Sequence, residues 1–126
     1  MSVIETQETS PQASVLDRSP IVHDFAIVAA TVNGSGSQTA NNTLIRAIFK
    51  MGVPVSGKNL FPSNIAGLPT WYTIRVSKHG YIARREGTEI LVAFNQKTAD
   101  EDLAALPVGG VCLYADDIKF AKPRAD

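Results

Sequence analysis

An apolar run that leads straight into a glycine-rich turn constrains this chain most. Residues 25–32, FAIVAATV, lack the polar and apolar alternation of a half-exposed strand, which predicts a strand covered on both faces, as inside a parallel sheet. Residues 33–37, NGSGS, follow. Residues 37–51 then repeat apolar side chains at spacings of three and four, which predicts an amphipathic helix. The residues on its inner face would be Ala40, Leu44, Ile48 and Met51.

The middle of the chain suggests a loop and a hairpin. Residues 53–69, VPVSGKNLFPSNIAGLP, contain three prolines and two glycines, so we expect a long loop without regular structure. Residues 71–77, WYTIRVS, alternate between two faces. The tripeptide KHG then offers a tight turn toward residues 81–85, which predicts a β-hairpin exposed on one side.

The last third adds two strands and a short helix. Residues 89–94, EILVAF, and residues 111–115, VCLYA, read as strands. Between them, TADE at residues 98–101 has the spacing of a capping box. The order of elements predicts an α/β fold, a Rossmann-like three-layer sandwich with a largely parallel sheet. We expect one domain over residues 21–126 and a disordered N-terminal tail over residues 1–20, which are rich in Ser, Thr, Gln, Glu and Pro.

Composition excludes several classes of partner. Twelve basic and twelve acidic residues leave no net charge, so we expect neither nucleic acid nor membrane as a partner. A single cysteine, Cys112, cannot form an internal disulfide or a thiolate cluster, and His23 and His79 have no companions suited to a metal site. No spanning segment or secretory signal is visible, and a cytoplasmic location is expected.

The glycine turn admits two interpretations. Its residues are Gly34, Ser35, Gly36 and Ser37. Free N–H groups at the start of the following helix favour an anion such as a phosphate. Alternatively, this is a tight strand-to-helix turn with Ser or Thr as the helix cap. The dinucleotide signature would need glycine where Thr39 stands, which argues against an NAD site.

The long segment after the helix contains the most specific pattern. Its core reads GVPVSGKNLFPSNIAGLPTWYTIR, and with the preceding NGSGSQTANNTLIRAIFKM it resembles the N-terminal gamma-type domain of the fused alpha subunit of 2-oxoacid:ferredoxin oxidoreductases. The resemblance covers residues 24–120. Ser37 and Thr39 stand where many gamma subunits have glycine. The resemblance therefore supports the fold more strongly than it supports nucleotide binding at the turn.

The resemblance implies a place in a larger enzyme. The family converts a 2-oxoacid, here with 2-oxoglutarate as one candidate, and coenzyme A to acyl-CoA and CO₂. It uses thiamine diphosphate, Mg²⁺ and [4Fe-4S] clusters, with ferredoxin as electron acceptor. This chain would bind none of these cofactors alone. Its partners would be the remaining domains of the alpha subunit and the thiamine-binding beta subunit, and the chain would be an incomplete, inactive piece of the subunit.

The resemblance also indicates a candidate site without assigning a catalytic residue. A lysine in this segment faces the substrate and cofactor cavity in the family, which gives Lys58 an electrostatic role on the substrate or coenzyme A side, with Asn59, Ser63 and Asn64 as supporting donors. From composition alone, a solvated loop lysine is the favoured interpretation of Lys58, and the resemblance reverses that order. Two alternative functions stay open: a free-standing Rossmann-like nucleotide-binding module and a structural interaction module.

Overall fold

The structure is a computed structural model that describes residues 23–60, 65–81 and 87–124. In these residues a five-stranded sheet has the order β2-β3-β1-β4-β5. The predicted N-terminal tail, over residues 1–20, lies outside the described residues. The elements in chain order are β1 Asp24–Val32, α2 Ser37–Lys50, β2 Val55–Leu60, β3 Pro69–Ser77, β4 Ile90–Ala93, α3 Ala99–Ala105 and β5 Val111–Tyr114.

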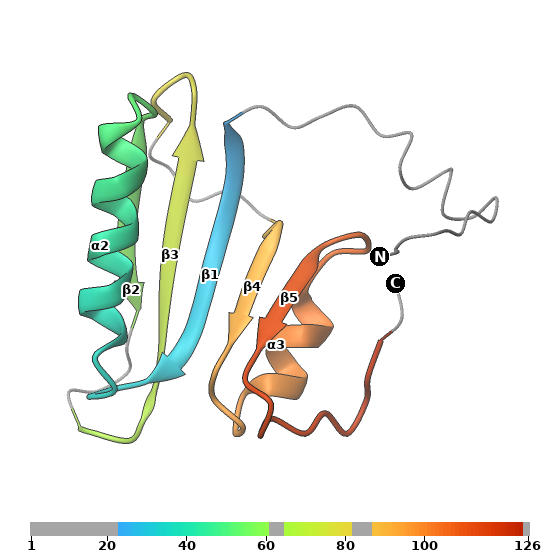
Figure 1. The fold of residues 1–126 in the computed structure, drawn as a ribbon. Coiled ribbons are helices and arrows are strands. Elements are labelled where there is room, and N and C mark those ends of the chain that lie inside the picture. Colours follow the sequence, from blue (N-terminus) through green and yellow to red (C-terminus); the bar gives the residue numbers. More distant parts are fainter. Residues whose placement is uncertain (1–22, 61–64, 82–86, 125–126) are drawn as a thin grey trace, which may run out of the picture.

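The sheet is largely parallel, as predicted. β1 pairs parallel with β4, and β4 pairs parallel with β5. β3 runs antiparallel to both of its neighbours, β1 and β2. Four of the five strands therefore point the same way and only β3 is reversed, as the arrows in Figure 1 show.

The longer helix, α2, covers one face of the sheet over β1, β2 and β3 (Figure 1). Ile45 and Ile48 of the helix pack against a buried cluster of apolar side chains. The cluster consists of Ala29, Val53, Tyr72, Ile74 and Val76. Because side chains alternate along a strand, the other face of the same three strands carries Ser56, Lys58, Thr73 and Arg75.

The short helix, α3, covers the opposite face over β4. Leu103 and the following Leu106 pack with Ala30, Leu91 and Ala93 in a second buried cluster. Helices on both faces give the three-layer α/β sandwich that the sequence predicted. The two helices cover diagonally opposite halves of the sheet, so neither lies over the α3 face of β2 and β3.

Two predictions for the middle of the chain are wrong. The expected loop over residues 53–69 contains strand β2, because the prolines fall outside Val55–Leu60 and leave six residues free to pair. The expected hairpin with residues 81–85 does not form on β3, because β2 and β1 already occupy its two edges. Residues 82–86 themselves lie outside the described part.

Predictions for the helices need smaller corrections. The inner face of α2 is rotated by about one residue, so that Ile45 and Ile48 face the core while Leu44 and Met51 are 41% and 70% exposed. Gly36, not Ser or Thr, is the N-cap of α2. Thr98 is the N-cap of α3, but its side chain forms no capping hydrogen bond.

Candidate functional site

The glycine turn lies where the topology of the sheet changes direction. From β1 the chain turns through α2 to β2 on one side, whereas from β4 it turns through α3 to β5 on the other. The carboxyl ends of β1 and β4 therefore flank a topological switch point, the usual position of ligand sites in open α/β sheets. The turn follows β1 directly, so the fold places it at this position.

Both glycines of the turn adopt backbone angles that other residues avoid. Gly34 and Gly36 have φ of 87° and 82°, in the left-handed region where a Cβ is strained. Ser37 lies within hydrogen-bonding distance of Thr31, with 2.7 Å between their hydroxyl oxygens. Among the described residues, no side chain caps α2, which is the arrangement that the anion interpretation of the turn requires.

Strand β2 brings Asn59 to the first turn of α2, directly after the glycine turn. Its Nδ2 lies 3.5 Å from Gln38 Oε1 in the first turn of α2, and its Oδ1 accepts a 2.8 Å hydrogen bond from Thr70. Asn95, which was not predicted from the sequence, is buried after β4 and donates to the Thr31 carbonyl at 3.2 Å. The sequence feature that could have indicated Asn95 is a polar residue directly after a buried strand.

Lys58 lies on the other face of the sheet from Asn59, because neighbouring residues of a strand point to opposite faces. It is exposed and pairs with Thr73 of β3. The predicted group of four is therefore split: Lys58 and Asn59 lie on opposite faces of the sheet, and only Asn59 lies next to the first turn of α2. Ser63 and Asn64 lie outside the described residues.

Lys58 lines a cavity of about 630 Å³ on the α3 face of the sheet. The cavity crosses the half of the sheet that α3 leaves uncovered and reaches the flank of that helix. Cationic, hydroxyl and apolar side chains line the cavity together, a composition typical of ligand pockets. Residues that line the cavity include Val28, Ser56, Lys58, Trp71, Thr73, Arg75, Leu91, Asp102 and Leu106.

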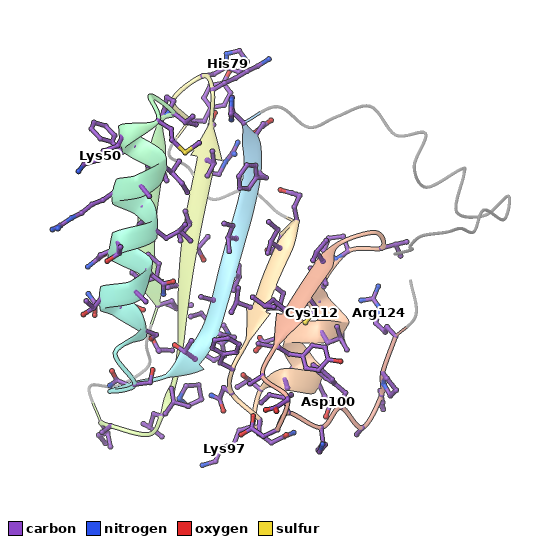
Figure 2. The ribbon with its side chains drawn as sticks, viewed as in Figure 1. Lys50, His79, Lys97, Asp100, Cys112 and Arg124 are labelled. Carbon is purple, nitrogen blue, oxygen red and sulfur yellow. The ribbon has the colours of Figure 1, made fainter. Side chains whose placement is uncertain are left out.

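One wall of the cavity is held by a hydrogen bond between β3 and α3. Trp71 Nε1 donates to Asp102 Oδ1 at 2.9 Å. Cys112 of β5 lies beside α3 (Figure 2) and is only partly exposed. Burial, and secondarily the negative charge of Asp102, raises the pKa of the Cys112 thiol above its ordinary value. A raised pKa disfavours the thiolate, so Cys112 is unsuited to be a nucleophile.

The sequence matches one protein family over most of its length. The profile of the pyruvate ferredoxin/flavodoxin oxidoreductase family matches residues 26–126. The chain belongs to this family. No curated protein sequence is significantly similar to it.

Solved structures with the same fold include gamma subunits of this family. The keto/oxoacid ferredoxin oxidoreductase gamma subunit of Geobacter sulfurreducens is 20% identical, with a TM-score of 0.62 over 78% of this chain and 56% of that one. A pyruvate oxidoreductase subunit of Thermotoga maritima is 18% identical, with a TM-score of 0.64 over 79% of this chain and 53% of that one. The gamma-type fold expected from the sequence is confirmed, and the chain spans about half of each of these subunits.

A larger enzyme contains the same fold as one part. In the 2-oxoglutarate:ferredoxin oxidoreductase of Magnetococcus marinus, solved with 2-oxoglutarate, coenzyme A and succinyl-CoA bound, the match has a TM-score of 0.69 and 20% identity. It covers 84% of this chain and 18% of that one. The fold is thus used both in separate subunits and within a longer chain.

Iron–sulfur clusters and metal ions require specific sets of ligands. A [4Fe-4S] cluster needs four thiolates, and the sequence has one cysteine. Within residues 23–60, 65–81 and 87–124, no three His, Cys, Asp or Glu side chains gather as a metal site. Neither described helix has the length and hydropathy needed to cross a membrane. The chain therefore lacks the thiolates for a cluster, and its described part offers no ligand set for a metal ion.

Proposed function

We propose that this chain is the gamma-type part of a 2-oxoacid:ferredoxin oxidoreductase that contributes to subunit assembly and to the substrate or coenzyme A side of the active site. The complex would oxidatively decarboxylate a 2-oxoacid, with 2-oxoglutarate as the first candidate, and transfer electrons to ferredoxin. The remaining domains of the alpha subunit and the beta subunit would supply thiamine diphosphate, Mg²⁺ and the clusters.

The position of Lys58 carries this proposal. Lys58 lies on strand β2 and lines an open cavity on the half of the sheet that no described helix covers. A strand holds a side chain more firmly than a long loop does, and a flexible ammonium at an open cavity can meet a carboxylate or phosphate presented by another domain. A partner on this face would complete the cavity and bury the charge, which strengthens its electrostatic effect.

Replacing Lys58 in the assembled complex tests the role. Lys58→Met keeps much of the aliphatic stem and removes the charge, so the stability of the chain should change little. Turnover of reconstituted complexes with equal cofactor content should fall by about tenfold or more, which corresponds to roughly 1.4 kcal/mol of transition-state stabilisation. Lys58→Arg should restore only part of it, because a planar guanidinium is not a compact point charge.

Two controls separate this role from a general loss of charge. Lys78→Met removes an exposed lysine from the turn after β3 and should leave turnover unchanged. The isolated chain should show no 2-oxoacid-dependent dye reduction. Activity of the isolated chain would overturn the proposal that it is one part of a larger enzyme. Normal turnover of the Lys58→Met complex would return Lys58 to the role of a solvated lysine.

A second candidate is a nucleotide-binding module, and one observation favours it. The glycine turn lies at the switch point of the sheet and precedes a helix without a side-chain cap. Calorimetry of the isolated chain with NAD, FAD and ATP distinguishes the two functions. Micromolar binding that Gly36→Asn leaves intact and Gly36→Val abolishes would support the module.

A further inference from the structure

The turn between β1 and α2, at the lower left of Figure 1, contains an Asn-Gly pair, Asn33–Gly34. The backbone nitrogen that follows an asparagine can attack the amide carbon of its side chain, and a Cβ on the following residue hinders that attack. Glycine has no Cβ. The other five asparagines of the sequence precede larger residues, so only Asn33 has this advantage. They are Asn41, Asn42, Asn59, Asn64 and Asn95.

The structure exposes the nitrogen that would attack. Gly34 is exposed, and its N–H donates no hydrogen bond to any described residue. The Ser35 N–H donates to the Val32 carbonyl at 3.1 Å, so Asn33 and Gly34 are the two central residues of a tight turn. By contrast, the amides that follow the two asparagines of α2 lie within the helix, where each donates to the carbonyl four residues earlier. Base in the solvent can therefore reach the Gly34 N–H and remove its proton.

Hydrogen bonds to residues 65–68 restrain Asn33 itself. Its N–H donates to the Leu68 carbonyl at 2.8 Å, and its own carbonyl accepts from the Gly67 N–H at 3.0 Å. Its side-chain Nδ2 donates to the Ile65 carbonyl at 3.2 Å. The side chain must turn away from that carbonyl to bring its amide carbon to Gly34. Release of residues 65–68 from the turn therefore accelerates the attack.

We propose that Asn33 is a site of spontaneous deamidation, restrained by its contacts with residues 65–68. The Gly34 nitrogen forms a bond to Asn33 Cγ, the Cγ–Nδ2 bond breaks, and Nδ2 leaves as ammonia with the proton that Gly34 gives up. Water then opens the cyclic imide at either carbonyl carbon. Cleavage between the nitrogen and Cγ gives aspartate, and cleavage of the original peptide bond gives isoaspartate. The steps together consume one water and release one ammonia.

Either product changes the turn at the switch point of the sheet. A carboxylate cannot donate to the Ile65 carbonyl and repels it, so the contact with residues 65–68 is weakened. Isoaspartate also lengthens the main chain by a methylene group at the end of β1. The added negative charge disfavours an anion at the turn before α2. This inference is independent of the role proposed for Lys58.

Peptide mapping by mass spectrometry tests the site on the full 126-residue chain, aged in warm, mildly alkaline buffer. Asn59 is the internal control, because it is half-buried like Asn33 but precedes Leu60. Asn33 should deamidate at least about tenfold faster than Asn59, which corresponds to a barrier lower by ~1.4 kcal/mol. The product should contain isoaspartate, which direct hydrolysis of the side chain does not form. Equal rates at the two positions, or aspartate alone, would overturn the inference.

Unfolding the chain tests the restraint. Guanidinium chloride removes the hydrogen bonds to residues 65–68, so Asn33 should deamidate several-fold faster in the unfolded chain than in the folded one. An equal rate in the two states would show that these contacts do not restrain the side chain.

A variant that mimics one product tests the consequence. Asn33→Asp should lower the melting temperature by about 4 °C, because it loses the hydrogen bond to Ile65. Asn59→Asp, the control, keeps the oxygen that accepts from Thr70 and should change the melting temperature less. A wild-type melting temperature for Asn33→Asp would refute the role of this side chain in holding residues 65–68.

Discussion

Gly57 offers the sharpest test of how the two layers of this domain fit together. It lies in β2, on the face that α2 covers, and pairs with Ile74 of β3. A Cβ at this position would be 2.3 Å from Ile45 Cδ1, and 2.7 Å from both Cε1 and Oη of Tyr72. Contacts this short force neighbouring atoms to move. The helix can approach the strand only because residue 57 has no side chain.

The destabilisation caused by Gly57→Ala depends on which neighbouring side chains can move. Ile45 can rotate its terminal methyl group, but the Tyr72 ring is buried and its hydroxyl donates to Asn42 Oδ1 at 2.8 Å. Overpacking of a core costs about 1–3 kcal/mol, and loss of the hydrogen bond adds about 1 kcal/mol. Replacing glycine in a strand returns about 0.5–1 kcal/mol. We expect a net destabilisation of about 2 kcal/mol.

Urea unfolding of Gly57→Ala should show this loss, and the melting temperature should fall by about 10 °C for a domain of this size. Tyr72→Leu removes both crowded ring atoms, so Gly57→Ala should cost less in that background, with a coupling energy of about 1 kcal/mol or more. Ser56→Ala, the adjacent position on the opposite face, is the control and should change stability little. Wild-type stability of Gly57→Ala, or an equal cost in both backgrounds, would refute the reasoning.

Two other predictions concern the glycine turn and the partly buried thiol of Cys112. Gly36→Val should destabilise the chain by about 2 kcal/mol, because a β-branched residue strongly disfavours a φ of 82°, whereas Gly36→Asn should cost less; an unchanged melting temperature for the valine variant would contradict this. Alkylation of Cys112 by iodoacetamide should rise with pH through a midpoint above that of free cysteine, because burial and Asp102 raise the thiol pKa. Asp102→Asn should lower that midpoint without bringing it to the free value, since burial is the larger cause, and a wild-type midpoint at or below that of free cysteine would show that the site is not desolvated.

The sequence by itself determined the elements whose signals are local. The apolar run, the glycine turn and the helix that follows are confirmed as β1 and α2, with positive φ at Gly34 and Gly36. The strands and helix of the last third are confirmed as β4, α3 and β5. Each is encoded in a continuous stretch, where side-chain periodicity and backbone freedom act over a few residues. The family could also be recognised from the sequence, because its most specific motif is a continuous segment.

Only the tertiary structure decided which segment pairs with which. Residues 55–60 have weak strand preference of their own and become β2 because β3 offers a free edge and Gly57 lets α2 approach closely. That pairing places Lys58 at the cavity and Asn59 beside the first turn of α2, and a loop prediction could not separate these two neighbours. Tertiary packing likewise joins Trp71 to Asp102. Contacts between segments distant in sequence depend on register and layer order, and these are fixed only when the core is packed.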